Sequence, residues 1–182
     1  MLKRLLFLTG SPGIGKTTVL LRVADALKAE GYRVGGMISR EVRSSGTRVG
    51  FEILDLSSSK TGWLAHVSQQ MGPQVGRYRV NLQDLDRIGV EAIVRAVESL
   101  DVVVIDEVGP MELFSAKFQE AVKRAVDSVK LVIGVVHWKA RCSLIDEVKA
   151  RADAEVYVVT LENRDKLHEV VVGKATEYLR HA

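Results

Sequence analysis

The sequence predicts a three-layer α/β domain with a mostly parallel central sheet. Short apolar runs alternate with helical stretches along most of the chain, which is the pattern of repeated strand–helix units. A glycine-rich loop joins the first apolar run directly to the first helix, and residues 101–106 (DVVVID) form a continuous apolar run typical of a strand buried on both faces. At 182 residues the chain is within the usual size of one domain, so we expect a single domain over residues 1–182.

The first elements surround the glycine-rich loop. Arg4–Thr9 is expected to be a buried strand, and Lys16–Glu30 has helical periodicity. Val34–Glu41 and Val49–Leu56 are predicted strands on either side of a turn at 44–47 (SSGT). Two strands separated by such a turn predict an antiparallel hairpin.

A less regular segment follows the hairpin. Residues 57–79 are polar and glycine-rich, and we expect an extended excursion with weak strands near Trp63–Val67 and Tyr78–Val80. A helix is then predicted over Asn81–Ser99, because Asn81 and Asp84 resemble a capping box.

The second half of the chain returns to regular alternation. The predicted strands are Asp101–Asp106, Lys130–His137 and Ala154–Thr160. The predicted helices are Glu112–Asp127, Ser143–Ala150 and Asn163–His181, the last capped by Asn163.

The composition is that of a globular protein, with 47% hydrophobic and 27% charged residues. The single cysteine, Cys142, excludes an intrachain disulfide and fits a reducing compartment. No apolar run approaches the ~20 residues of a membrane span. The apolar run at the N-terminus is short and leads straight into the glycine-rich loop, unlike a signal peptide. We therefore expect a cytoplasmic protein without membrane association.

The formal net charge of +3 is too small to indicate nucleic-acid binding by itself. Residues 1–91 carry 13 Lys and Arg against 8 Asp and Glu, whereas residues 92–182 carry 13 against 15. The basic excess therefore lies in the half with the glycine-rich loop, where an anionic ligand would be held. The sequence does not favour nucleic acid as a partner and identifies no protein partner.

Residues 10–17 (GSPGIGKT) match the phosphate-loop pattern G-x-x-x-x-G-K-[ST]. Its glycines let successive backbone amides point at a phosphate group, while the lysine reaches the β and γ oxygens and the Thr17 hydroxyl ligates Mg²⁺. The predicted nucleotide-binding residues are Gly10, Ser11, Pro12, Gly13, Ile14, Gly15, Lys16, Thr17 and Thr18. The pattern predicts Mg²⁺-dependent binding of a nucleoside triphosphate.

Two adjacent carboxylates follow the apolar run DVVVI. Asp106 ends that strand, so we expect it at the sheet edge that faces the ligand, where it would contribute to holding Mg²⁺ together with Thr17. Glu107 is one residue further on and can reach the attacking water, which makes it the predicted general base. Lys16 is the second predicted catalytic residue.

Several other side chains are candidates for contact with the γ-phosphate. His137 ends the strand that we expect beside the Asp106 strand. Among the arginines between the two motifs, those at positions 40, 43, 48, 77 and 79 form a cluster, and we expect at least one of them to reach the phosphates. Arg40, Arg43 and Arg79 are retained as candidates with His137. Trp63, Tyr78, Trp138 and Tyr157 are able to stack on a base, although packing is the commoner use of such residues.

This ordered set of motifs resembles the small stand-alone THEP-type nucleoside-triphosphatases over nearly the whole chain. The resemblance is carried by FLTGSPGIGKTT (7–18), SREVRSSGTRVGFEILDL (39–56), VGRYRVNL (75–82), IDEVGPMELFS (105–115) and VTLENRDKL (159–167). It implies slow hydrolysis of several nucleoside triphosphates to diphosphate and phosphate on a RecA-like P-loop core. It also implies the roles given above for Lys16, Thr17, Asp106 and Glu107. Pro110 stands where many members of that family carry lysine, so any contact of that lysine is absent here.

Two other functions remain open at the level of the sequence. A nucleoside or nucleotide kinase has a similar size and phosphate loop, and residues 57–80 would then form a lid or an acceptor site. A binding switch would use slow turnover to keep a partner-binding surface in its triphosphate state, with RNA remodelling as a weaker variant. Phosphate release without an acceptor would separate hydrolysis from the kinase.

Overall fold

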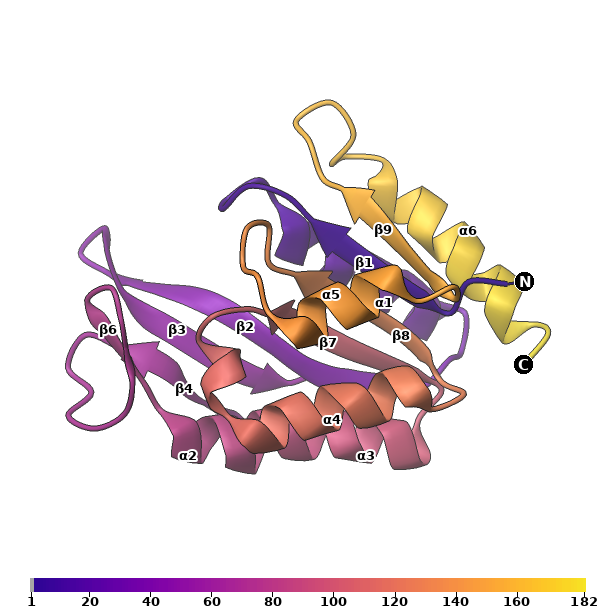
Figure 1. The fold of residues 1–182 in the computed structure, drawn as a ribbon. Helices are drawn as coiled ribbons and strands as arrows, with labels where there is room; N and C mark the ends of the chain where they lie inside the picture. The colour runs from indigo at the N-terminus through magenta and orange to yellow at the C-terminus, as the bar shows by residue number, and fades with distance from the viewer. Residues whose placement is uncertain (1) are drawn as a thin grey trace.

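A computed structural model of the protein describes residues 2–182 and contains one nine-stranded sheet (Figure 1). The strand order is β5-β6-β4-β3-β2-β7-β8-β1-β9. The parallel strands are β2 (Val34–Ser44), β7 (Val102–Val108), β8 (Leu131–Val136), β1 (Leu5–Thr9) and β9 (Ala154–Val158). This confirms the predicted α/β fold with a parallel sheet at its centre.

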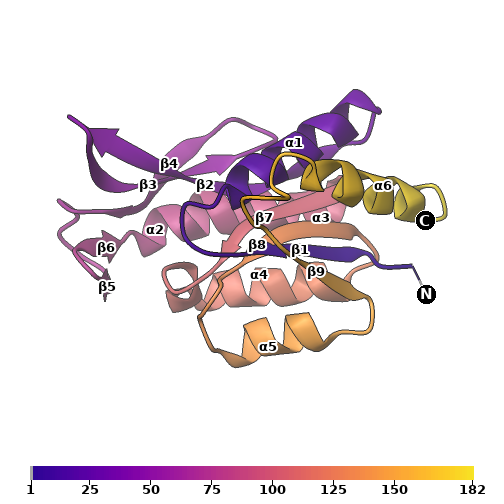
Figure 2. The ribbon, with the colours of Figure 1, turned by 90° about the horizontal axis from the view of Figure 1, so that it is seen from above.

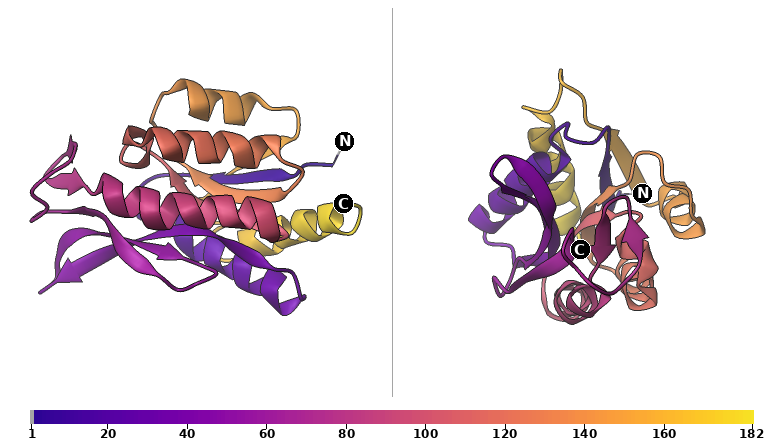
Figure 3. Two further views of the ribbon diagram at one scale, coloured as in Figure 1. Left: turned by 90° about the horizontal axis from the view of Figure 1, so that it is seen from below. Right: turned by 90° about the vertical axis from the view of Figure 1, so that its left-hand side faces the viewer.

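Helices cover both faces of the parallel strands, which produces the expected three layers (Figures 2 and 3). One face carries α1 (Lys16–Ala29) and α6 (Leu167–Leu179), and the other carries α3 (Glu91–Ser99), α4 (Ala116–Asp127) and α5 (Ser143–Ala150). In β1, Leu6 and Leu8 belong to the core under α1, whereas Leu5 and Phe7 belong to the core under α4. A strand buried on both faces needs apolar residues at every position, which explains the continuous apolar runs.

The hairpin and the excursion form an antiparallel extension of this sheet. Its strands are β3 (Thr47–Asp55), β4 (Thr61–His66), β5 (Gln74–Val75) and β6 (Tyr78–Val80). β2 pairs antiparallel with β3, so the predicted hairpin is confirmed, and both of its strands are longer than predicted. The weak strands expected within the excursion correspond to β4 and β6, while β5 was not predicted.

The helical segment after the excursion is confirmed but is not one regular helix. It consists of α2 (Leu82–Asp84), a π-helical turn (Leu85–Val90) and α3. Asn81 caps it as expected, since its side-chain oxygen accepts a 3.0 Å hydrogen bond from the Asp84 amide. The Asp84 carboxylate does not complete a capping box, because it accepts a 3.0 Å hydrogen bond from the Trp63 amide instead.

Two predicted helix starts were wrong. The helix predicted from Glu112 begins at Ala116, because the Ser115 hydroxyl caps it by accepting a hydrogen bond from the Phe118 amide, after a short 3₁₀ turn. The last helix begins at Leu167 rather than after Asn163, and it has no side-chain cap. The Asn163 side chain instead stabilises the preceding turn. No helix within residues 2–182 is long and apolar enough to cross a membrane.

Candidate active site

The glycine-rich loop connects β1 to α1 at the carboxyl edge of the parallel strands. Its glycines at positions 10, 13 and 15 have φ angles of +152°, +76° and +113°, which L side chains rarely adopt. A β-carbon at Gly10 would also lie 2.8 Å from the Val159 carbonyl oxygen. Side chains are therefore excluded where the backbone must turn sharply before the helix.

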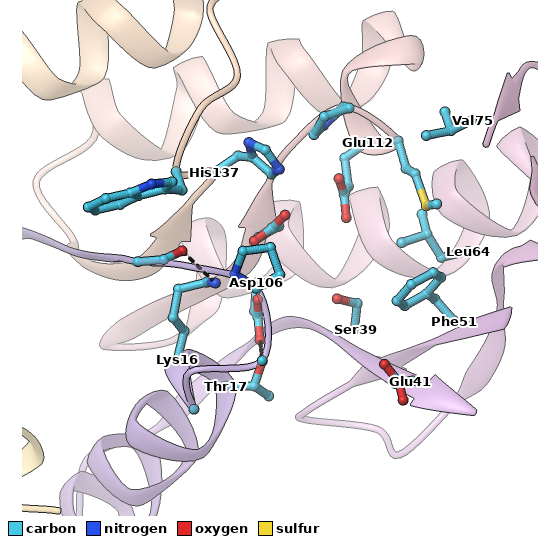
Figure 4. A pocket seen from close by; sticks show the side chains of 18 of the residues that line it. Lys16, Thr17, Ser39, Glu41, Phe51, Leu64, Val75, Asp106, Glu112 and His137 are labelled. Carbon is cyan, nitrogen blue, oxygen red and sulfur yellow. Dashed lines mark hydrogen bonds between the residues drawn. The ribbon is translucent and has the colours of Figure 1, made fainter. Parts of the chain in front are cut away.

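Lys16 is the first residue of α1, and its side chain folds back over the loop (Figure 4). Its ammonium group donates hydrogen bonds to the carbonyl oxygens of Gly10 (2.9 Å) and Ser11 (3.0 Å). These bonds hold a positive charge directly beside the loop and the N-terminus of α1. A helix N-terminus and an ammonium group together favour an anionic ligand at this point.

Thr17 and Asp106 are brought into direct contact by the sheet topology. β7 carries Asp106 and lies two strands from β1, with β8 between them, so all three strands end at the same edge. The Thr17 hydroxyl donates a 2.6 Å hydrogen bond to the Asp106 carboxylate, which is only 3% exposed. Burial raises the pKa of Asp106 to about 7, although the hydrogen bond from Thr17 opposes this rise.

Glu107 follows Asp106 in the last part of β7 and lines the same cavity. Burial raises its pKa above the usual range, while nearby His137 and the Lys16 ammonium group act in the opposite direction. A carboxylate with a raised pKa is a better proton acceptor than a solvated one.

His137 directly follows β8 and lies between the ends of β7 and β1 at the sheet edge (Figure 4). Its Nδ1 accepts hydrogen bonds from the backbone amides of Lys139 (3.2 Å) and Ala140 (2.9 Å). A neutral imidazole that accepts at Nδ1 carries its proton on Nε2. His137 lines the cavity, so this N–H is a donor available to a ligand.

These side chains share one cavity of about 440 Å³ that extends from the glycine-rich loop to the antiparallel extension (Figure 4). At the far end its lining includes the apolar side chains of Phe51, Leu64, Val75 and Met111. The predicted site residues that line it are Gly10, Pro12, Gly13, Gly15, Lys16, Thr17, Thr18, Asp106, Glu107 and His137. Ser11 and Ile14 belong to the loop, whose turn is closed by a 3.3 Å hydrogen bond between them, but they do not line the cavity.

The three candidate arginines do not reach this cavity. Arg40 forms a 2.6 Å ion pair with Glu52 on β3, because the two residues are paired across the hairpin. Arg43 binds Glu41 at 2.5 Å, and Arg79 donates to the Gly72 carbonyl at 3.0 Å. Their guanidinium groups are therefore occupied by contacts on the extension.

Arg48 is the one arginine of the five in the sequence cluster that lines the cavity within the described part of the chain. It donates hydrogen bonds to the Tyr78 hydroxyl (2.8 Å) and the Glu41 carboxylate (3.1 Å). Sequence spacing alone does not distinguish Arg48 from its neighbours, because the choice depends on strand register.

The structure adds a buried carboxyl group to which no sequence motif assigns a role. Glu112 is 3% exposed, and in Figure 4 its carboxyl group is directed into the cavity. Burial and the charge of nearby Glu107 raise its pKa well above the usual range. The available signal was a lone acid between Met111 and Leu113, which is unusual in an otherwise apolar run.

Among the aromatic residues able to stack on a base, Trp138 alone lines the cavity within residues 2–182, with 42% of its surface exposed. Trp63 packs against His66 with their ring centroids 4.5 Å apart, and Tyr78 packs against Phe51 at 5.4 Å. Tyr157 packs against the core under α1 and α6.

Comparison with known proteins places the chain in a family. A family model described as NTPase matches residues 5–172. The chain is 48% identical to the nucleoside-triphosphatase THEP1 of Thermofilum pendens over 161 residues, which cover 88% of each chain. It is 46% identical to the THEP1 of Methanopyrus kandleri, over 94% of this chain and 95% of its relative.

Two solved structures have the same fold. The crystal structure of THEP1 from Aquifex aeolicus has a TM-score of 0.83 at 29% identity and covers 92% of this chain and 96% of its own. The solution structure of a human cancer-related nucleoside triphosphatase has a TM-score of 0.81 at 33% identity. The match covers 96% of this chain and 98% of that structure's chain. The chain therefore belongs to the NTPase family, together with the THEP1 nucleoside-triphosphatases.

Proposed function

We propose that this protein is a Mg²⁺-dependent nucleoside-triphosphatase that releases phosphate from several nucleoside triphosphates slowly and with little preference for the base. The observation that carries the proposal is the placement of Glu107, a half-buried carboxylate, in one cavity with the Lys16 loop and the Thr17–Asp106 pair. The names of the THEP1 relatives support hydrolysis as the reaction.

The glycine-rich loop and Lys16 bind the triphosphate. The N-terminus of α1 and the loop amides favour the β-phosphate, and the ammonium group moves from two carbonyl oxygens to the β and γ oxygens. The carbonyl contacts keep the lysine close to its working position, so little side-chain entropy is lost when a nucleotide binds.

Mg²⁺ fits the oxygen donors at the start of α1. The Thr17 hydroxyl and the Asp106 carboxylate lie 2.6 Å apart, and both are hard oxygen ligands of the kind that Mg²⁺ prefers. The raised pKa of Asp106 means that nearby positive charge does not offset the cost of burying this carboxylate, and a divalent cation would offset it. Thr17 and Asp106 would hold the ion, which would offset negative charge on the triphosphate.

Glu107 acts as the general base. It orients a water molecule toward the γ-phosphorus and accepts a proton as the water oxygen attacks. The bond from the γ-phosphorus to the bridging oxygen breaks, and that oxygen leaves with the nucleoside diphosphate. The Nε2–H of His137 stabilises the negative charge on the γ-phosphate, because its Nδ1 is already held by two backbone amides.

The kinase alternative is not favoured, because the relatives named above are called nucleoside-triphosphatases. Residues from the excursion, Leu64 and Val75, do line the cavity beyond the phosphate loop. The binding switch is compatible with slow hydrolysis, but no contact within residues 2–182 favours it over the enzyme.

Hydrolysis in ¹⁸O-labelled water tests the proposal. With ATP, Mg²⁺ and no acceptor, we expect equal amounts of ADP and phosphate, with ¹⁸O in the phosphate and none in the ADP. That result requires attack of water on the γ-phosphorus. Release of AMP and pyrophosphate, or phosphate transfer only when a nucleoside is added, would overturn the proposed reaction.

A further inference from the structure

The direction of the bound nucleotide follows from the site geometry. Asp106 and Glu107 lie on the β7 side of the glycine-rich loop, so the γ-phosphate is on that side. The α-phosphate and the nucleoside are at the opposite end of the triphosphate and leave the loop away from β7. The sheet order β7-β8-β1-β9 places β9 on that side of β1. The first protein segment next to the nucleoside is therefore the turn from β9 to α6, which passes close to the start of α1 (Figure 2).

This turn, residues 159–166, is firmly attached to the sheet and to itself. The Val159 amide donates a 2.8 Å hydrogen bond to the Thr9 carbonyl, immediately before the glycine-rich loop. The Asn163 side chain accepts a 2.9 Å hydrogen bond from the Thr160 amide and donates a 2.8 Å bond to the Val158 carbonyl. Asn163 thus fixes the turn, and the residue after it has a defined position.

Arg164 extends from this turn along the glycine-rich loop. Its Nη1 donates a 3.4 Å hydrogen bond to the Ile14 carbonyl oxygen. Its Cδ lies 3.8 Å from the position that a β-carbon would take on Gly15. The side chain is exposed, and no carboxylate within residues 2–182 forms an ion pair with it. The guanidinium group is therefore exposed to solvent beside the glycine-rich loop.

We propose that the 159–166 turn is the nucleobase subsite and that Arg164 is its platform, on which the base stacks through its π face. The inference rests on the proposed function, because the direction of the nucleotide depends on the roles given to Asp106 and Glu107. Every base has a π face, so stacking on a guanidinium plane does not distinguish among bases. The neighbouring Asn163 has a side-chain amide that could otherwise bond to the edge of a base. Its oxygen and its nitrogen are already bonded to the backbone of Thr160 and Val158. The subsite thus binds bases without reading their edges, which gives a structural cause for base tolerance.

Binding of diphosphates and of pyrophosphate separates base contacts from phosphate contacts. The Mg²⁺ complexes of ADP, GDP, CDP, UDP and inorganic pyrophosphate are titrated into the protein in a calorimeter. Arg164→Ala is expected to weaken all four diphosphates by about tenfold, as loss of a stacking contact does, and to leave pyrophosphate affinity unchanged. Arg164→Lys is expected to behave like alanine, because an ammonium group has no flat face. Arg180→Ala, which removes another exposed arginine next to the end of α6, controls for the loss of charge.

Three outcomes would overturn the inference. Unchanged diphosphate affinity in Arg164→Ala would show that the base lies elsewhere. Equal weakening of pyrophosphate would show that Arg164 supports the phosphate loop rather than the base. Loss of base-dependent affinity in Trp138→Ala, with Arg164→Ala unchanged, would assign the platform to the exposed tryptophan in the cavity. If the wild-type protein shows the expected binding pattern but releases no phosphate, the proposed reaction fails while the subsite stands.

Discussion

The Thr17 hydroxyl donates a 2.6 Å hydrogen bond to the Asp106 carboxylate, and this contact joins the first helix to the end of β7. The two residues are 89 positions apart in the chain, yet they meet because β1 and β7 are parallel and end at one edge of the sheet. A hydroxyl and a buried carboxylate in contact beside a phosphate loop form the metal-binding half of the proposed site.

Removal of the Thr17 hydroxyl tests the proposed metal-binding role of the Thr17–Asp106 pair. Thr17→Ala is expected to raise the Mg²⁺ concentration needed for half-maximal phosphate release by at least about tenfold, because one oxygen ligand and its bond to Asp106 are lost. Thr17→Ser keeps the hydroxyl and is the matched control. A Mg²⁺ dependence in Thr17→Ala that equals wild type would show that this hydroxyl is not a ligand.

His137 is predicted to contact the γ-phosphate through Nε2. His137→Ala should lower kcat by about tenfold or more, because a preorganised hydrogen-bond donor is lost from the transition state. His137→Asn supplies an oxygen for the amides of Lys139 and Ala140 but lacks a ring N–H directed at the cavity. Both variants are therefore expected to be slow in single-turnover phosphate release. Full activity in His137→Asn would limit the role of this residue to holding the loop.

Gly36 is predicted to be essential for the central sheet. Its φ angle is +125°, and a β-carbon there would lie 2.0 Å from the Val104 carbonyl oxygen on β7. Gly36→Ala should lower the free energy of unfolding by about 3 kcal/mol or more, measured by urea denaturation. Gly173 lies within α6, where an added β-carbon would have no described atom within 4 Å, so Gly173→Ala should raise stability by about 0.5–1 kcal/mol. Equal effects of the two variants would contradict the packing described for β2 and β7.

Asp55 is predicted to make the folded protein less stable at acid pH. It is 1% exposed, and although burial alone raises its pKa, hydrogen bonds from Ser58, Ser57 and Arg95 lower it to about 2. A depressed pKa means that the stabilisation is complete above the ordinary value of 3.8 and is lost as the pH falls from there toward about 2. At pH 7 wild type should exceed Asp55→Asn by about 2 kcal/mol in unfolding free energy. Urea midpoints of both proteins between pH 6 and about 3 should converge as the pH falls, and a constant difference would contradict this account.

The parts of the fold that depend on local pattern could be predicted from the sequence. The loop at 10–17 has a spacing typical of a strand–turn–helix connection, and the structure has that connection. The meeting of Asp106 with Thr17 could also be predicted, because parallel strands that lead to one ligand end at one edge. These inferences needed residue types and spacing, but no strand order.

The remaining features depend on tertiary context. Arg40 and Arg48 have similar surroundings in the sequence, and the register of the hairpin pairs Arg40 with Glu52 and leaves Arg48 beside the cavity. The helix start at Ala116 depends on the Ser115 hydroxyl that caps it. The Asn163 side chain is used by its own turn, and the helix that begins at Leu167 has no side-chain cap. No sequence motif assigns a role to Glu112, and its burial beside Glu107 becomes apparent only in the structure.

The most direct test of the account compares phosphate release from ATP by wild type and by Glu107→Gln, with ADP binding measured on the same preparations. Glutamine keeps the size and polarity of the side chain but cannot accept the proton of the attacking water. We predict slow release by wild type, a rate lower by at least about tenfold in the variant, and unchanged ADP affinity. Release by Glu107→Gln at the wild-type rate would contradict the assignment of Glu107 as the general base.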